Sequence, residues 1–172
     1  MGSENEVLIV VPPVEFQDEE LKGVREALSE ASIGIKIAAV SANECRGVSG
    51  TSVMPDYTLD DVDVERFDGI IFIGGPGTEG YLHDQSVHEI VRGFFESNKL
   101  LAAICWASAI LANAGVLKGK KATVWEGAKE DLAKGGAEYS SEHVIVDGNI
   151  ITADGPDFAT KFGQEIAKQL IG

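Results

Sequence analysis

Short, uninterrupted apolar runs recur along this chain, and they constrain its fold more than any other feature. Each contains four or five consecutive apolar residues, most of them β-branched or aliphatic. Such runs are typical of strands buried on both faces of a sheet. The sequence therefore predicts strands at Val7–Val11, Ile35–Val40, Asp68–Ile73 and Leu100–Ile104.

Most of the intervals between these runs carry apolar residues at helical spacing. The predicted helices are Asp18–Ser32, Asp84–Ser97, Trp106–Ala114, Ala128–Lys134 and Phe158–Leu170. Shorter β segments are predicted as an arm over 43–57, a strand at Ala122–Val124 and a hairpin over Val144–Thr152. Buried strands alternating with amphipathic helices indicate an α/β fold, with a mostly parallel sheet covered by helices on both faces. We expect a single domain spanning residues 1–172.

Composition excludes several classes of function. The chain of 172 residues has 14 Lys and Arg against 28 Asp and Glu, a net charge of −14. Such an acidic protein is a poor partner for nucleic acid or for an anionic membrane surface. The apolar runs are far shorter than the roughly 20 residues of a membrane span. We expect no signal peptide, because the first residues lack the basic and apolar segments of one.

Cysteine and histidine usage points to a reduced compartment without a metal site. Two cysteines and no secretory signal are typical of a cytoplasmic protein with free thiols. The three histidines are scattered, and none forms a zinc pattern with a cysteine. We therefore expect no metal and no cofactor.

Cys105 stands at the junction between a predicted strand and the helix that follows it. Ligands of parallel sheets bind beyond the carboxyl ends of the strands, so the segments after Val11, Ile73 and Ile104 matter most. Small neighbours would allow a tight turn like the nucleophile elbow of hydrolases. A helix N-terminus would also lower the thiol pKa below its usual value. The alternative is a buried structural cysteine.

Two other segments lie at the same expected edge. Gly75–Gly80 spells G-x-G-x-x-G after a strand, which permits a dinucleotide site, a plain turn, or Gly74 and Gly75 amides that stabilise an oxyanion. Four acidic residues lie within Glu15–Glu20. Most of them would be solvated at a helix start, but one could face Cys105 with a raised pKa and move protons.

At these residues the sequence resembles the ThiJ/PfpI superfamily, whose flavodoxin-like core is shared with class I glutamine amidotransferases. The similarity lies in five segments: Gly47–Leu59, Phe67–Gly75, Ala102–Cys105, Leu111–Gly119 and Val146–Asn149. The resemblance implies a flavodoxin-like three-layer sandwich with the nucleophile at Cys105. It places the glutamate partner at Glu20 when one extra residue follows the first strand, and at Asp18 otherwise. The oxyanion amides fall on Gly75 and Trp106.

The sequence departs from the peptidase-like branch of this superfamily at the residue after the nucleophile. That branch has histidine there, whereas this chain has Trp106, whose indole is no general base. Glu79 matches a glutamate that this branch borrows from a neighbouring subunit. Trp125 stands where many relatives have His or Tyr, so the two tryptophans suggest a narrow apolar pocket or, alternatively, core packing.

The resemblance implies a glutathione-independent glyoxalase or deglycase acting on small α-oxoaldehydes through Cys105 and Glu20. A redox sensor or stress chaperone that uses cysteine oxidation is the alternative, and an intracellular peptidase or amidase is a second. Family members pair near their active sites, so we expect a homodimer or larger homo-oligomer. In the arm, Val48, Val53, Met54 and Tyr57 would need a covering surface.

Overall fold

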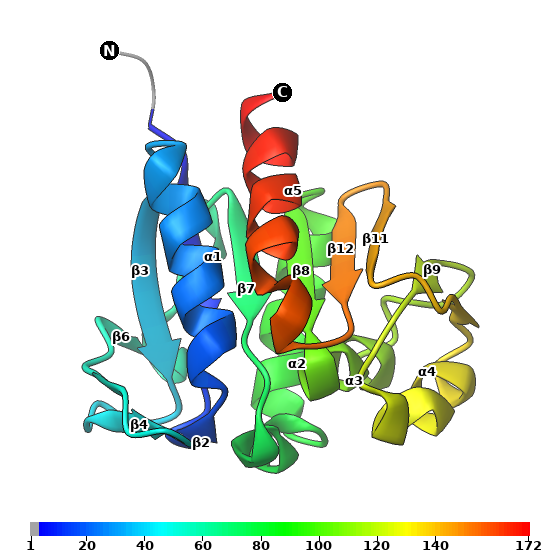
Figure 1. Ribbon diagram of the computed structural model, residues 1–172, viewed down its shortest axis with the longest axis horizontal. Coiled ribbons are helices and arrows are strands. Elements are labelled where there is room, and N and C mark those ends of the chain that lie inside the picture. The colour runs from blue at the N-terminus through cyan, green and yellow to red at the C-terminus, as the bar shows by residue number, and fades with distance from the viewer. Residues whose placement is uncertain (1–3) are drawn as a thin grey trace.

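The computed structural model describes residues 4–172, and a seven-stranded sheet in the order β11-β12-β8-β7-β1-β3-β6 forms its centre (Figure 1). β11 pairs antiparallel with β12, and the other neighbouring pairs are parallel. The strands are β1 Glu6–Val10, β3 Gly34–Ala39, β6 Tyr57–Thr58, β7 Gly69–Phe72, β8 Leu100–Ile104, β11 Val144–Asp147 and β12 Ile150–Ala153. The expected mostly parallel α/β sheet is confirmed.

Helices cover both faces of this sheet. α1 (Asp18–Glu30) and α5 (Ala159–Ile171) lie side by side on one face (Figure 1), and α2 (Gln85–Glu96), α3 (Ser108–Asn113) and α4 (Lys129–Lys134) pack on the other. Successive side chains of a strand point to opposite faces. Nearly all the buried ones are apolar here, so each face builds its own buried cluster and the three-layer sandwich follows.

Two smaller sheets flank the central one. β2 (Val14–Phe16) pairs with β4 (Cys45–Gly47), which pairs antiparallel with β5 (Ser52–Val53). β9 (Lys121–Ala122) pairs with β10 (Glu138–Tyr139). The expected arm is thus the β4–β5 hairpin, whereas β2 and β10 were not anticipated because runs of two or three residues carry too little pattern.

Three-residue to six-residue 3₁₀ helices occupy several connections. They are Leu59–Asp61, Val64–Arg66, Pro76–Tyr81, Cys105–Ala107, Glu126–Ala128 and Pro156–Phe158. One of them corrects an expectation: the helix predicted from Trp106 begins as an α-helix only at Ser108, because the chain first makes a tighter turn. The strand predicted over Ala122–Val124 also ends early, since the Thr123 N–H donates to the Thr152 hydroxyl at 3.0 Å.

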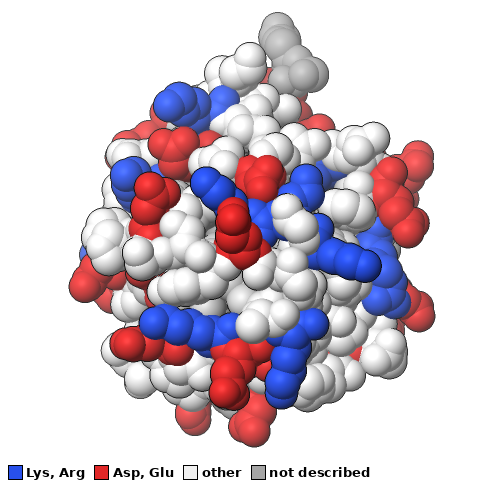
Figure 2. Space-filling model, turned by 90° about the vertical axis from the view of Figure 1, so that its right-hand side faces the viewer, with Lys and Arg blue, Asp and Glu red and all other residues white. Residues whose placement is uncertain are grey.

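The surface carries charges of both signs. Figure 2 shows Lys and Arg interspersed with Asp and Glu on the face that carries β9, β11 and α4. Among residues 4–172, no helix combines the length and apolar character needed to cross a membrane.

Candidate active site

The carboxyl ends of β1, β7 and β8 meet at one edge of the sheet. Val10 is in register with Phe72, and Phe72 with Ala103. The segments that follow these three strands are therefore neighbours, as expected for the ligand-binding edge of a parallel sheet.

Cys105 occupies a strained turn directly after β8. Its φ is +62°, a left-handed conformation that is uncommon for a residue with a side chain. The N–H of Trp125, in the loop after β9, donates to the Cys105 carbonyl at 3.1 Å and stabilises this turn. The side chain is partly exposed rather than sealed in the core. The structure thus forms the elbow that the sequence predicted.

Glu20 reaches the elbow from the first turn of α1. Its side chain is fully buried, and Oε1 accepts the Gly74 N–H at 2.9 Å. The other oxygen, Oε2, is buried with no hydrogen-bond partner among the described residues. Burial raises the pKa of Glu20 to about 7, against the lowering effects of the Gly74 N–H and the nearby Cys105 thiol.

The expected low thiol pKa is wrong for Cys105. Burial raises its pKa to about 12, and the neighbouring charge of Glu20 adds to the rise. The N–H groups of Trp106 and Gly75 donate toward the sulfur and oppose this shift without cancelling it. The helix effect is weak because a 3₁₀ turn and a helix of only six residues follow the cysteine.

Three backbone amides, those of Gly74, Gly75 and Trp106, are the candidates for an oxyanion site. Gly75 and Trp106 present their N–H groups to the Cys105 sulfur and lower the thiol pKa. Gly74 does not, because its N–H is engaged by Glu20 and its carbonyl accepts the Gln17 N–H at 2.9 Å. Gly74 therefore positions the carboxyl group. A Cβ there would come within 2.9 Å of both Cys105 Cβ and Glu20 Oε1.

The glycine-rich segment owes its composition to close packing against β2. Gly75 has φ +113°, and a Cβ on it would overlap the backbone of Glu15 and Phe16. A Cβ on Gly77 would overlap the Val14 carbonyl. α2 begins only at Gln85, capped by the Asp84 side chain. The first two glycines of the pattern, Gly75 and Gly77, thus face protein rather than an open phosphate cradle, so the dinucleotide alternative has no support.

Asp18, the rival partner of the cysteine, serves the arm instead. Its carboxylate accepts the N–H groups of Ser49 at 2.8 Å and Thr51 at 2.9 Å. Burial alone would raise the pKa of Asp18, but hydrogen bonds from Thr51 and Ser49 lower it below its usual value. The structure thus places Glu20, not Asp18, beside the thiol.

A cavity of about 350 Å³ opens above the sulfur. It is lined by Gln17, Gly75, Pro76, Cys105, Trp106 and Trp125. The Trp106 and Trp125 rings lie 5.7 Å apart at 57°. Trp125 is 45% exposed, so the core-packing alternative is wrong for this residue and both indoles form the pocket wall. Gln17 was missed, although its place directly before the helix start at this edge could have marked it.

No histidine of the described residues lines this cavity. His88 is buried and its Nε2 lies 2.9 Å from the Leu82 carbonyl, while exposed His83 lines a separate cavity with it. His143 pairs with Asp154, Nδ1 to Oδ2, at 2.8 Å. Glu79 is exposed in the loop after β7 and is not part of the lining.

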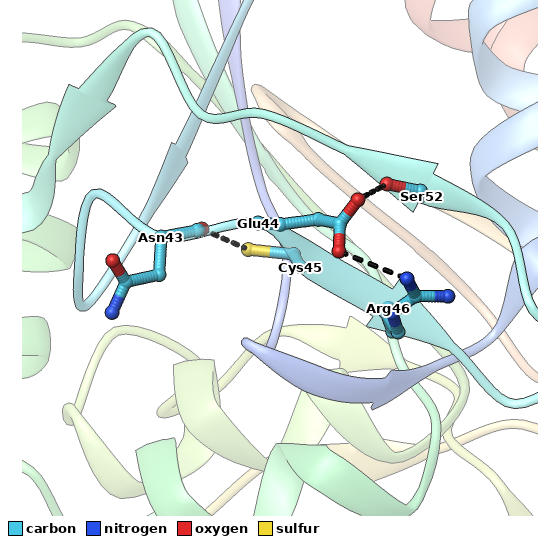
Figure 3. Close-up of polar contacts among 5 residues, drawn as sticks. All are labelled: Asn43, Glu44, Cys45, Arg46 and Ser52. Carbon is cyan, nitrogen blue, oxygen red and sulfur yellow. Dashed lines mark hydrogen bonds and ion pairs between the residues drawn. The ribbon is translucent and has the colours of Figure 1, made fainter.

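Cys45 has a different environment from Cys105. It is fully buried at the start of β4, and its Sγ lies 3.7 Å from the Asn43 carbonyl (Figure 3). Burial, and then the Glu44 carboxylate, raise its pKa. Glu44 itself points away, toward Ser52 and Arg46. Cys45 therefore has neither an access route nor a carboxyl partner at its sulfur.

Comparison with known proteins identifies the architecture. Residues 5–169 match the DJ-1/PfpI family. Deglycase PfpI of Pyrococcus furiosus is 34% identical over 156 residues, which cover 91% of this chain and 94% of the relative. Glutathione-independent glyoxalase DJR-1.2 of Caenorhabditis elegans is 27% identical over 172 residues, which cover 100% and 92%. The crystal structure of a ThiJ/PfpI domain protein from Brachyspira murdochii has a TM-score of 0.96 at 28% identity, covering 99% and 98%. The chain, with its elbow cysteine and buried glutamate, belongs to the DJ-1/PfpI family.

Proposed function

We propose that this protein converts small α-oxoaldehydes to 2-hydroxy acids without glutathione, with Cys105 as nucleophile and Glu20 as acid and base. One observation carries the proposal: a fully buried carboxyl group, with its pKa raised to about 7 and its Oε2 without a hydrogen-bond partner among the described residues, lies beside the thiol at the base of a pocket. Relatives named deglycase and glyoxalase support the same class of chemistry.

The thiol and the carboxyl group act as one proton-sharing pair. With pKa values of about 7 for Glu20 and about 12 for Cys105, the pair holds a single proton between these limits. When that proton moves from sulfur to Glu20, the resulting thiolate adds to the aldehyde carbon. The carbonyl π bond breaks, and the oxygen takes the negative charge and then a proton, giving a hemithioacetal.

Glu20 then moves a proton between the two substrate carbons. Its carboxylate removes the hydrogen of the former aldehyde carbon as a proton and returns a proton to the ketone carbon. The hydroxyl proton moves from the former aldehyde oxygen to the former ketone oxygen, which leaves a 2-hydroxy thioester on Cys105. Water hydrolyses the thioester, releases the 2-hydroxy acid and restores the thiol. The overall reaction adds one water to the oxoaldehyde and needs no external oxidant or reductant.

The backbone amides of Gly75 and Trp106 suit the developing oxyanions. Both N–H groups lie close enough to the sulfur to lower the thiol pKa, so they are near the carbon that the sulfur attacks and the oxygen that this carbon carries. Preorganised donors of this kind stabilise charge that forms during the reaction. A reduced compartment such as the cytoplasm suits this chemistry, because the nucleophile must remain a thiol.

Peptidase activity is not proposed, because no histidine of the described chain lines the pocket to protonate an amine leaving group. General acid–base catalysis of that kind accelerates a reaction roughly 10²–10⁴-fold. A glyoxalase cycle has no such leaving group and can run on the carboxyl group alone.

The test is to incubate the purified protein with methylglyoxal and follow lactate formation. We expect turnover that is abolished by Cys105→Ser, reduced about 100-fold by Glu20→Gln, and unchanged in the matched control Cys45→Ser. Turnover that survives Cys105→Ser would overturn the proposal. Absence of turnover in the wild type, together with peroxide oxidation of Cys105 to a sulfinic acid, would favour the redox-sensor alternative.

A further inference from the structure

Two indole rings dominate the wall of the Cys105 pocket. Trp106 and Trp125 are the chain's two tryptophans, and their rings pack against each other with centroids 5.7 Å apart. Trp125 leaves 45% of its surface exposed. A large aromatic surface therefore faces the space in which a substrate must lie to reach the sulfur.

The backbone of Trp125 is tied to the nucleophile, and its ring packs between Trp106 and Gly127. Its backbone N–H donates to the Cys105 carbonyl at 3.1 Å, and its ring lies over Gly127, where a Cβ would overlap it. Trp106 packs on it at an angle of 57°. An aromatic group that contacts this wall would thus have a defined position relative to the sulfur, without ordering a mobile side chain first.

The described residues that line the pocket include no charged side chain. Gln17 is the neutral polar one, and its Oε1 accepts the Glu19 N–H at 2.8 Å. Its amino group is therefore the end that can donate to a ligand. The nearest charge that can form is the Glu20 carboxylate under the thiol, which repels anions, as does the net charge of −14.

We propose that this pocket selects neutral α-oxoaldehydes that carry an aromatic or similarly large apolar group. The apolar group packs on the exposed face of the tryptophan pair while the aldehyde carbon reaches Cys105. The Gln17 amide donates to the ketone oxygen. Charged oxoacids are rejected because no cation in the pocket would pair with their carboxylate. This inference rests on the proposed function and names its substrate class.

The kinetic test compares kcat/KM for phenylglyoxal, methylglyoxal and the anionic 4-carboxyphenylglyoxal. We expect the wild type to prefer phenylglyoxal over methylglyoxal by about tenfold, the scale of an aromatic pair, and to act poorly on 4-carboxyphenylglyoxal. Trp125→Ala should remove most of this preference, while Trp125→Phe should keep most of it. Phe95→Ala is the matched control, since Phe95 is 40% exposed on α2 and outside the pocket.

A second variant moves the ring without deleting it. Gly127 is exposed, so Gly127→Ala should fold, but the new Cβ would enter the space of the Trp125 ring. We expect kcat/KM for phenylglyoxal to fall several-fold while that for methylglyoxal stays within twofold. Equal losses for both substrates, or an unchanged ratio in Trp125→Ala, would overturn the inference while leaving the proposed function standing.

A binding measurement keeps the inference testable even if no turnover occurs. Because both tryptophans lie in the pocket, the intrinsic tryptophan fluorescence of the Cys105→Ser variant reports on this site alone. Acetophenone, a neutral and unreactive aromatic ketone, should change this fluorescence in a saturable way. Acetone and benzoate should bind at least about tenfold more weakly. Equal responses to all three probes would refute the selectivity.

Discussion

The proton shared by Cys105 and Glu20 governs the chemistry at the scale of single residues. The carboxyl group has no ionic partner at its buried position, so burial holds it protonated up to about pH 7. The pKa of the Cys105 thiol is also raised, in part by the Glu20 charge, so ionisation of one group opposes ionisation of the other. This arrangement makes the singly protonated pair the dominant state between about pH 7 and 12.

The activity should therefore rise with pH. Below pH 7 both groups hold protons and no base is present; above it Glu20 can accept the thiol proton. We expect kcat/KM for methylglyoxal to increase through an apparent pKa near 7 and then level off. Steady-state rates from pH 5 to pH 9 provide the measurement. A bell centred near pH 6, or the same profile in Glu20→Gln, would contradict the assignment.

The same carboxyl group should cost stability as pH rises. Its pKa rises from the usual 4.5 to about 7 on folding, so the native state keeps a proton that the unfolded chain releases. The stabilisation is complete below pH 4.5 and is lost by pH 7. Between pH 4.5 and pH 7, the free energy of unfolding of the wild type should therefore fall by about 3 kcal/mol more than that of Glu20→Gln. Urea unfolding at pH 4.5 and pH 8 measures the difference, and a constant difference would contradict it.

The two thiols should react with alkylating agents in a fixed order. Cys105 is partly exposed at the pocket floor, whereas Cys45 is fully buried at the start of β4 in the arm. Iodoacetamide at pH 8 followed by peptide mass spectrometry should modify Cys105 first, with Cys45 following only on unfolding. Faster modification of Cys45 in the folded protein would mean that the arm opens more readily than the elbow reacts.

At the scale of elements, the long buried runs made the sheet predictable. Val7–Val11 and Leu100–Ile104 carry no polar residue, and the structure contains strands there as β1 and β8. β2 was not predictable, because Val14–Phe16 has only three residues and two of them are exposed. Its position comes from pairing with β4, a contact that no local pattern encodes.

The site was predictable only in part, for a related reason. The position of Cys105 at a strand–helix junction was visible in the sequence. Which carboxylate meets it depends on how β2 lengthens the path to α1, so Glu20 and Asp18 could not be separated. The thiol pKa also depends on burial and on Glu20, neither of which appears in local sequence.

Tyr81 connects the ends of two neighbouring strands. Its buried hydroxyl donates to the Val11 carbonyl at 2.9 Å and accepts the Val40 N–H at 3.1 Å. Tyr81→Phe would leave both backbone groups unpaired, so we expect a loss of about 1–3 kcal/mol in the free energy of unfolding. Tyr139→Phe, at a 38% exposed ring, is the control and should change it by less than about 0.5 kcal/mol. Equal urea midpoints would show that water replaces the Tyr81 bonds.

On the scale of the whole molecule, the arm and the neighbouring strand β2 carry three strongly exposed apolar side chains. Val14 of β2 is 60% exposed, and Val48 and Met54 of the arm are 56% and 62% exposed. Val53 is buried and Tyr57 is half-buried by the chain's own fold, so only part of the arm needs a partner, less than the sequence led us to expect. A cavity of about 520 Å³ runs beside Met54, between α1, β3 and β5.

We therefore propose that the protein self-associates through this arm, although its charge of −14 opposes close approach. Multi-angle light scattering at micromolar concentration should give twice the chain mass of 18.2 kDa, or a higher multiple. Met54→Glu would bury a charge without a partner, so it should shift the mass toward 18.2 kDa. Val146→Glu, at a 46% exposed position on β11, is the control and should leave the mass unchanged. A wild-type mass of 18.2 kDa would mean that the arm surface stays exposed to solvent.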